Sequence, residues 1–200
     1  MIVLKVGGSL LEEAPALLRR VTATGADVLV VPGGGVFADA VRRIDGERGL
    51  SPDAAHWMAV LAMDEYAYYL ADRSGIGLSD SLAVKKGAHI ALPYELLRAD
   101  DALPHSWDVT SDTIAAWIAK KTGGRLVKAT DVDGIYLEGR LTGRVDASML
   151  AGKETCVDRA LPGFLIAHRM DALVVNGRCA GRVEKAIRGE PVTGTVILGK

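Results

Sequence analysis

The sequence predicts an α/β fold in which helices cover both faces of a mainly parallel central sheet, forming a three-layer αβα sandwich. Short apolar runs alternate with segments of helical periodicity along the whole chain. Several of these runs are continuously apolar, which is typical of strands buried on both faces of a parallel sheet. The chain has 200 residues, 49% of them hydrophobic, which is enough for one domain with a substantial core. We therefore expect a single domain over residues 1–200.

The expected elements follow one another in a regular order. Strands are predicted at the apolar runs 2–6, 27–31, 81–84, 88–92, 124–129, 171–175 and 193–198. Helices are predicted between them, at residues 10–23, 36–47, 52–73, 111–122, 158–168 and 180–188. Ser51 and Pro52 form a favourable helix start, and Gly75 suits the end of the same helix. Glycines and charges between residues 131 and 153 indicate an irregular excursion or a small hairpin within the domain.

Composition narrows the classes of function. Because 24 basic residues face 25 acidic ones, no global field attracts nucleic acid. We expect no membrane span and no secretory signal, and therefore a cytoplasmic protein. Cys156 and Cys179 match neither a disulfide framework nor a CxxC metal pair, which fits a reducing compartment. The four histidines show no metal-ligand spacing, so no protein-bound metal site is expected.

The helix predicted at residues 52–73 carries apolar residues around most of its circumference. One face of such a helix can pack on its own sheet, whereas the other needs a second cover. A second copy of the chain would provide this cover, and a fully buried core helix is the alternative. We expect a homodimer or a higher homo-oligomer.

Lys5 interrupts the first apolar run, in the stretch MIVLKVGGSL. An unpaired ammonium is costly in a strand that is buried on both faces. Gly7, Gly8 and Ser9 follow it, and a helical pattern starts at Leu10. A strand, a glycine turn and a helix N-terminus together favour a bound anion, and Lys5 could point at the same anion. The alternative is a lysine that extends from the strand end to solvent beside an ordinary turn.

A second glycine cluster repeats this arrangement in VLVVPGGGVFADA. Gly33, Gly35 and Ala38 satisfy the dinucleotide fingerprint GxGxxG/A. That fingerprint expects an acidic residue at the end of the next strand, but the corresponding distance falls on Asp53, in the first turn of a predicted helix. The Walker pattern GxxxxGK[ST] is absent as well. Two glycine turns remain, each able to bring backbone N–H groups close to phosphate oxygens.

Two further segments follow in the second half of the chain. WDVTSDTIAAWIA places Thr110, Ser111 and Asp112 at a helix start, where Thr110 or Ser111 could cap the helix and Asp112 complements its dipole. VKATDVDGIY places Asp131 and Asp133 after a buried strand. Helix capping and a common strand-to-turn sequence explain each segment alone, so their order along the chain is what carries the information.

The ordered motifs resemble those of the amino acid kinase family, also called the carbamate-kinase-like fold. The resemblance covers nearly the whole chain and is carried by LKVGGS, VVPGGG, TSDTIAAWIA, KATDVDGIY and VVNGRCAGRVEKAIRGEPVTGTVI. The C-terminal half is similar to the uridylate kinases. The compact length and the TSDT segment resemble the [5-(aminomethyl)furan-3-yl]methyl phosphate kinases of methanofuran biosynthesis.

The resemblance implies a role for each motif. Lys5, with Gly7, Gly8 and Ser9, would hold the transferring γ-phosphate of ATP, and Asp112 would orient Lys5. The adenine nucleotide would lie along Lys128, Asp131, Val132, Asp133, Gly134 and Tyr136. The late GGM-plus-lysine motif of acetylglutamate-type members is missing here. The second transfer cation is therefore open among Lys128, Lys153 and Mg²⁺.

The expected acceptor is a small phosphate monoester, converted to a diphosphate. Its phosphate oxygen is already ionised at neutral pH, so no general base is needed, and no convincing His–carboxylate pair stands out in the sequence. The alternatives are a uridylate kinase, an isopentenyl phosphate kinase, whose extra histidine after the second glycine turn has no match here, and a storage protein that binds ATP without catalysis.

We expect the acceptor between the second glycine turn and the segment PHSWDVTSD, at Gly33, Gly34, Gly35, Trp107, Asp108, Thr110 and Ser111. Trp107 would pack on a flat ring and Asp108 would pair with an amine. The alternative places Trp107 in the core and Asp108 in solvent. In that case the amine partner would be another acidic residue, such as Asp39, Asp64 or Glu65.

Overall fold

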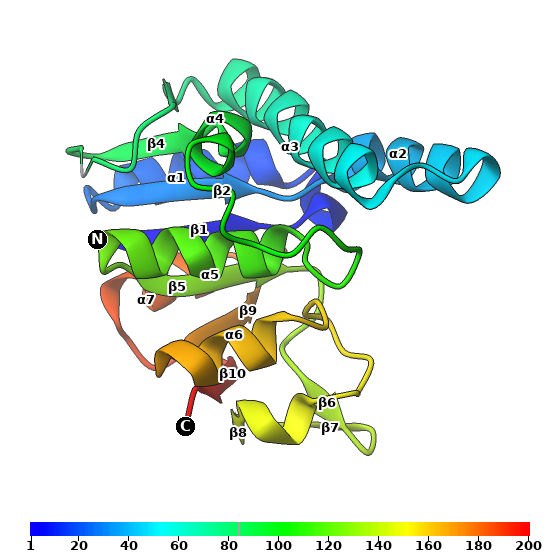
Figure 1. Cartoon of the computed structure of the whole chain (residues 1–200). Helices are drawn as coiled ribbons and strands as arrows, with labels where there is room; N and C mark the ends of the chain where they lie inside the picture. The colour runs from blue at the N-terminus through cyan, green and yellow to red at the C-terminus, as the bar shows by residue number, and fades with distance from the viewer. Residues whose placement is uncertain (84) are drawn as a thin grey trace.

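Helices and strands alternate through the N-terminal half of the computed structural model, which describes residues 1–83 and 85–200 (Figure 1). The chain begins with β1 (Ile2–Val6), a 3₁₀ turn (Gly8–Leu10), α1 (Ala14–Ala23) and β2 (Val28–Pro32). It continues with α2 (Gly35–Arg48), α3 (Pro52–Ser74), β3 (Leu78–Ser79), β4 (Ala88–Ala91) and α4 (Pro93–Arg98).

The C-terminal half starts with α5 (Ser111–Thr122), β5 (Arg125–Thr130) and the short hairpin of β6 (Tyr136–Leu137) and β7 (Arg140–Leu141). The chain then forms β8 (Arg144–Asp146), a 3₁₀ turn (Ala147–Leu150), α6 (Leu161–His168), β9 (Ala172–Asn176), α7 (Arg182–Arg188) and β10 (Gly194–Leu198). The small hairpin expected between residues 131 and 153 is therefore present as β6 and β7.

The central sheet has the order β3-β4-β2-β1-β5-β9-β10-β8. Neighbouring strands from β3 to β9 are parallel, while β10 is antiparallel to β9 and parallel to β8. β1 lies in the middle, with β2 on one side and β5 on the other. The crevice beyond the carboxyl ends of such strands, where the strand order changes direction, is where open α/β sheets bind ligands.

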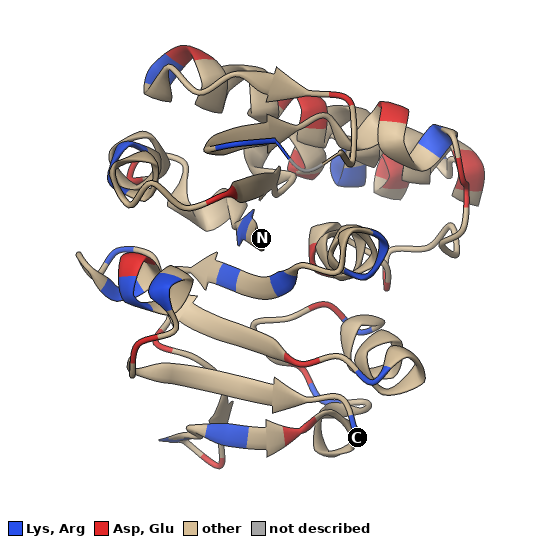
Figure 2. Ribbon diagram, turned by 90° about the vertical axis from the view of Figure 1, so that its left-hand side faces the viewer, with Lys and Arg blue, Asp and Glu red and all other residues tan. Residues whose placement is uncertain are grey.

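Helices cover both faces of the sheet, as the continuous apolar runs predicted. In Figure 1, α4, α5 and α6 lie in front of the sheet and α1 and α7 lie behind it. The core consists of two buried clusters, which include Trp117 on the α5 face and Leu18 on the α1 face. The predicted αβα sandwich is confirmed. Figure 2 shows acidic and basic residues interspersed over the helices, in keeping with the balanced composition.

Several predicted boundaries were wrong. The helix expected from residue 10 begins at Ala14, because the chain first makes the 3₁₀ turn that buries Leu10. The strand expected at 81–84 is instead β3, at Leu78–Ser79; residues 80–83 are outside any strand, and residue 84 lies outside the described residues. The short helix α4 was missed, since its six residues are too few to show a helical period.

The long helix α3 agrees with its predicted limits. The Ser51 side chain accepts a hydrogen bond from the Ala54 N–H, and Gly75 ends the helix with a φ of 75°. Tyr66 and Leu70 are fully buried, whereas Leu61 and Tyr68 are exposed. The expected homo-oligomer remains a prediction. Among the described residues, no helix is both long and apolar enough to cross a membrane.

The two glycine turns touch each other at the carboxyl ends of β1 and β2. A Cβ atom on Gly8 would lie 2.2 Å from the Gly35 Cα, and one on Gly33 would lie 2.8 Å from the Gly8 nitrogen. The Gly33 N–H also donates to the Val6 carbonyl at 2.8 Å. Glycine is required here because no side chain fits between two backbones at this separation.

Gly8→Ala should lower the free energy of unfolding by about 2–3 kcal/mol, because the new methyl group overpacks against the Gly35 backbone. Gly46→Ala is the matched control. Gly46 lies within α2 with open space around it, so alanine should raise the free energy of unfolding by about 0.5–1 kcal/mol. Urea unfolding of both variants checks this pair, and equal effects would contradict the close approach.

Candidate active site

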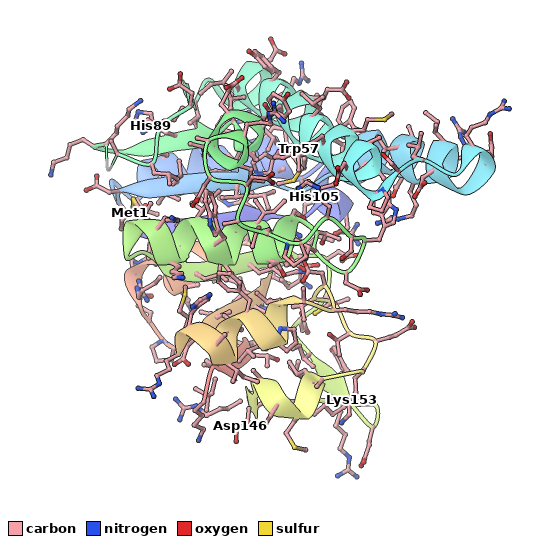
Figure 3. All side chains as sticks on the ribbon, in the orientation of Figure 1. Met1, Trp57, His89, His105, Asp146 and Lys153 are labelled. Carbon is pink, nitrogen blue, oxygen red and sulfur yellow. The ribbon has the colours of Figure 1, made fainter. Side chains whose placement is uncertain are left out.

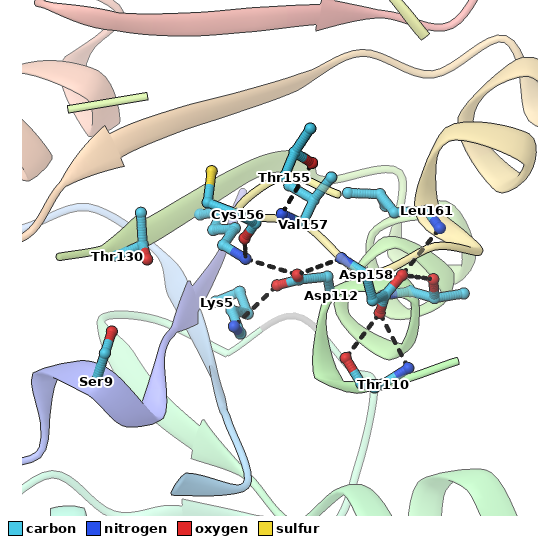
Figure 4. Close-up of polar contacts among 12 residues, drawn as sticks. Lys5, Ser9, Thr110, Asp112, Thr130, Thr155, Cys156, Val157, Asp158 and Leu161 are labelled. Atoms are coloured by element: carbon cyan, nitrogen blue, oxygen red, sulfur yellow. Dashed lines mark hydrogen bonds and ion pairs between the residues drawn. The ribbon is translucent and has the colours of Figure 1, made fainter. Parts of the chain in front are cut away.

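A buried carboxylate joins two lysines at the carboxyl edge of the sheet (Figure 4). Lys5 on β1 and Lys128 on β5 are register partners on neighbouring strands, so both side chains point to the α5 face. Asp112, in the first turn of α5, lies 2.8 Å from the Lys5 Nζ and 2.6 Å from the Lys128 Nζ. The three residues are only 5–6% exposed. The structure thus brings together Lys5 and Asp112, as the resemblance implied, and places beside them Lys128, one of the candidates for the second cation.

Burial and mutual attraction shift the pKa values of this cluster in opposite ways. Burial alone would raise the pKa of Asp112, but attraction by Lys128 and Lys5 outweighs it and holds the pKa well below its usual range. Burial lowers the pKa of the Lys5 ammonium below its ordinary 10.5, against the attraction of Asp112, and the nearby Lys128 lowers it further. Two ammonium groups therefore share one carboxylate. An anion at the edge of the sheet would lie beside both lysine side chains and favour their charged form.

Asp158 fixes the position of Asp112 from the loop that precedes α6. Its backbone N–H donates to the Asp112 carboxylate at 3.0 Å. Its own carboxylate accepts hydrogen bonds from the N–H and hydroxyl groups of Thr110 and Thr113, and from the Leu161 N–H. One side chain thus caps the starts of both α5 and α6.

The predicted cap of α5 was therefore wrong. Neither Thr110 nor Ser111 caps the helix with its own side chain. Thr110 instead donates its hydroxyl to Asp158, 48 residues further along the chain. No local pattern could have identified Asp158, because its partners lie on a different element. The Lys128 ammonium is held in the same way, by the Cys156 carbonyl of this loop.

A cavity of about 730 Å³ opens beside the glycine turns. It lies where the acceptor was expected, between the second glycine turn and the segment before α5. Gly8, Gly34, Gly35, Trp107, Thr110 and Ser111 are among its lining residues. The N–H groups of Gly7 and Gly33 donate to the Ala129 and Val6 carbonyls, so these two glycines hold the turns together. Because these two N–H groups are already used within the protein, the residues proposed to contact phosphate are reduced to Gly8, Ser9, Gly34 and Gly35.

Asp108 does not line the cavity, which corrects its proposed role as the partner of an amine. Its side chain is exposed, 4.0 Å from the Arg159 guanidinium. Of the other acidic residues considered, Asp64 accepts a hydrogen bond from the Tyr94 N–H, Glu65 is exposed, and neither lines the cavity. Asp39 does line it. Trp107 is neither core nor fully exposed: it is half-buried and faces the cavity.

The acidic residues after β5 lie along the carboxyl edge of the sheet. Asp131 accepts a hydrogen bond from the Ser9 hydroxyl at 3.0 Å and so joins β5 to the first glycine turn. Asp133 accepts hydrogen bonds from Asn176 at 2.9 Å and from Arg182 at 2.5 Å. These bonds lower the pKa of Asp133, that from Asn176 foremost. Both carboxylates are therefore engaged within the protein.

The remaining nucleotide-side residues differ in their surroundings. Gly134 is buried with a φ of 154°, and a Cβ atom there would lie 2.5 Å from the Thr195 hydroxyl, so it serves the fold. Val132 is half-buried and Tyr136 is 49% exposed. Lys153 is exposed and lies away from β1 and the glycine turn that follows it (Figure 3), which leaves Lys128 and Mg²⁺ as candidates for the second transfer cation.

Sequence reasoning missed the polar residues at the far end of the cavity. Arg42 and Asp45 come from α2, His56 from α3 and His105 from the loop before α5. The rings of His56 and His105 stack with their centroids 4.2 Å apart, and Trp57 meets His105 edge-on (Figure 3). The sequence pattern that could have identified Arg42 and Asp45 is their helical spacing from the second glycine turn, which places them on the same side of α2.

The surroundings of the two stacked histidines shift their pKa values in opposite directions. His105 Nδ1 lies 2.6 Å from the Asp53 carboxylate and Nε2 lies 2.8 Å from that of Asp101. The hydrogen bond with Asp53, and then that with Asp101, raises the pKa of His105 above 6.5. Burial, together with the neighbouring His105, lowers the pKa of His56 to about 4. Both ring nitrogens of His105 face carboxylate oxygens, and these contacts tie the loop before α5 to the start of α3.

A parallel sheet with a lysine pair and two touching glycine turns at its carboxyl edge defines an enzyme that binds anionic groups, of the class that transfers phosphoryl groups. Comparison with known proteins assigns the class more closely. Residues 84–151 match the model of the amino acid kinase family. The chain is 34% identical to the [5-(aminomethyl)furan-3-yl]methyl phosphate kinase of Methanocaldococcus jannaschii, over 100% of this chain and 98% of that protein. The chain belongs to the amino acid kinase family and is a kinase.

More distant relatives agree with this assignment. The uridylate kinase of Thermofilum pendens is 24% identical, over 98% of this chain and 97% of that protein. The fold is similar to the crystal structure of the uridylate kinase of Archaeoglobus fulgidus, with a TM-score of 0.72 and 20% identity over 98% of this chain and 100% of that one. The UMP kinase of Bacillus anthracis gives a TM-score of 0.73 and 15% identity, over 100% of this chain and 96% of that one.

His105→Gln should destabilise the protein more at pH 6 than at pH 9. Because folding raises the pKa of His105, its ion pairs stabilise the folded state fully below pH 6.5, and this contribution is lost as the pH rises through the raised pKa. Urea unfolding of the wild type and the variant at both pH values checks this. In a protein with Asp53→Asn and Asp101→Asn, the same change should lose this pH dependence; if it persists, the two carboxylates are not its cause.

Proposed function

We propose that this chain transfers the γ-phosphoryl group of ATP to the phosphate of a small phosphate monoester and so forms a diphosphate. The observation that carries the proposal is the pair of buried lysines that share Asp112 beside two touching glycine turns. We further propose [5-(aminomethyl)furan-3-yl]methyl phosphate, of methanofuran biosynthesis, as the acceptor. The 34% identity to the M. jannaschii kinase over its whole length supports this acceptor.

The proposed reaction needs positioning and charge neutralisation more than proton transfer. An ionised oxygen of the acceptor phosphate attacks the γ-phosphorus, and the bond to the oxygen shared with the β-phosphate breaks. ADP leaves with that electron pair, and the acceptor gains a P–O–P link. Lys5 and Lys128 would stabilise the charge on the moving phosphoryl group, and Asp112 would hold both ammonium groups in place. No proton has to be removed from the attacking oxygen.

Each reactant has a distinct place in this proposal. The acceptor phosphate would bind at Gly34 and Gly35, beside the cavity. The triphosphate of ATP would bind at Gly8 and Ser9, with the nucleotide along the strip from Asp131 to Tyr136. Mg²⁺ bound to ATP would neutralise phosphate charge, and its ligands would be mainly phosphate oxygens and water. The Ser9 hydroxyl and the Asp131 carboxylate are oxygen donors of the kind that Mg²⁺ accepts.

A panel of phosphate monoesters incubated with Mg-ATP tests the proposed acceptor. The panel should contain [5-(aminomethyl)furan-3-yl]methyl phosphate, UMP and isopentenyl phosphate, with the products separated by chromatography. We expect a diphosphate from the aminomethylfuran compound with a kcat/KM at least tenfold above those of the other two. A preference for UMP would assign the chain to the uridylate kinases instead, and no turnover of any member would favour an ATP-binding storage protein.

Lys5→Ala should lower kcat by at least 100-fold while changing the Kd for ATP only a few-fold, because its charge acts on the group in transit. Rapid-quench turnover and calorimetric ATP titration separate the two effects. Lys153→Ala is the control, since it removes an exposed ammonium far from the β1 turn and should alter neither quantity. A loss of ATP affinity with kcat retained would place Lys5 in ground-state binding instead.

A further inference from the structure

One stripe of α2 forms a wall of the cavity and leads from the second glycine turn to its far end. Gly35, Ala38, Asp39, Arg42 and Asp45 all line the cavity. Their spacing of three, one, three and three residues keeps them on one side of the helix. The stripe begins where the acceptor phosphate would bind, so its polar side chains face the rest of the acceptor.

The charges on this stripe do not balance. Asp39 and Arg42 pair with each other at 3.2 Å, and the Arg42 guanidinium lies 4.7 Å from the centre of the Trp107 ring. Asp45 is half-buried and has no ion-pair partner in the described part of the chain. Its carboxylate accepts hydrogen bonds from the Leu50 N–H at 2.9 Å and from the Trp107 indole at 2.7 Å. Two neutral donors therefore fix the carboxylate and leave its negative charge uncompensated.

The two ends of the cavity are opposite in sign. At the glycine turns, two lysines face one carboxylate. Away from the turns, Arg42 pairs with Asp39 and His105 lies between the carboxylates of Asp53 and Asp101, whereas the Asp45 carboxylate on the cavity wall has no ion-pair partner among the described residues. Asp53 and Asp101 are largely exposed and screened by water, whereas Asp45 is half-buried. Asp45 is thus the carboxylate whose charge acts most directly on a bound molecule.

We propose that Asp45 binds a cationic group at the end of the acceptor opposite its phosphate, and so selects acceptors that carry an ammonium. This inference rests on the proposed function, because it takes the phosphate to bind at the second glycine turn. Asp45 follows Gly35 by ten positions, which is about 15 Å along the helix. The Asp45 carboxylate is held by the Leu50 N–H just beyond the end of α2. Hydrogen bonds of about 3 Å at the phosphate and at the ammonium take up part of the distance, so the acceptor itself spans about 9 Å.

The middle of the cavity suits an apolar spacer between these two groups. Val60 and Met63 of α3 line it, together with Val109 and the Trp107 ring. A small flat ring between the phosphate and the ammonium would bury its faces against these side chains. The acceptor class is therefore an ω-ammonium phosphate monoester with a short apolar centre.

Binding measured without ATP tests this assignment separately from turnover. The probes are [5-(aminomethyl)furan-3-yl]methyl phosphate and its analogue with a methyl group in place of the aminomethyl group, each titrated calorimetrically. We expect the unmodified protein to bind the amine at least tenfold more tightly than the analogue. Asp45→Asn should abolish this preference by weakening the amine at least tenfold and the analogue less than twofold, since the phosphate contacts remain.

Three further variants make the result specific. Glu47→Gln removes an exposed carboxylate two residues along α2 and should retain the full preference, which excludes a general effect of helix charge. If Asp45→Asn fails to fold in thermal unfolding, Asp45→Ser provides a hydroxyl for one of the two hydrogen bonds and takes its place. Asp108→Asn tests the rival carboxylate and should leave the preference intact.

The outcomes separate the two proposals. An unmodified protein without a preference for the amine, or an Asp45 variant that retains it or weakens both probes equally, overturns the assignment of Asp45. Loss of the preference in Asp108→Asn alone would move the cation site to that residue. A preference that depends on Asp45 in a protein that makes no diphosphate from the amine would support the cation site and reject the proposed reaction.

Discussion

The rest of the site depends on the ion pairs that Asp112 makes with Lys5 and Lys128. Two lysines on adjacent strands repel each other, and burial makes each ammonium costly. A single carboxylate between them offsets part of this cost and sets the separation of their nitrogens. Because one carboxylate serves both lysines, neither ammonium has a partner of its own. An anion bound at the sheet edge would then lower the free energy of the site. The binding energy gained in this way can be used to position the phosphoryl group.

The surrounding structure keeps Asp112 in this position. Asp158 caps α5 and α6 with one side chain while its backbone N–H holds the Asp112 carboxylate. Lys128 is tied to the same loop through the Cys156 carbonyl. The close contact of Gly8 with Gly35 brings the two turns within reach of one phosphoryl group. Helix capping, strand register and glycine packing together fix the distance between the lysine pair and the glycine turns. Phosphoryl transfer requires this distance to be held closely.

The sequence predicted what local patterns encode. Continuous apolar runs identified β1, β2 and β5, and the glycine turns with Lys5 indicated an anion site before any comparison. Long-range pairings were not accessible in this way. Thr110 was expected to cap its own helix, but a carboxylate 48 residues away takes its hydrogen bonds. Asp108 is next to Trp107 in sequence, whereas the carboxylate that contacts the Trp107 indole is that of Asp45, from α2.

The opposite charges at the two ends of the cavity also bear on how two phosphorylated reactants are kept apart. Both reactants carry phosphates, and the lysine pair attracts either one. The Asp45 carboxylate would repel the remaining phosphates of a nucleotide that entered the cavity, so ATP would be favoured on the Ser9 side of the turns. An acceptor with a single phosphate and a cation meets no such repulsion. Discrimination would then arise from the charge of the cavity wall as much as from its shape, which makes the half-buried carboxylate on α2 as important for orientation as the glycine turns are for contact.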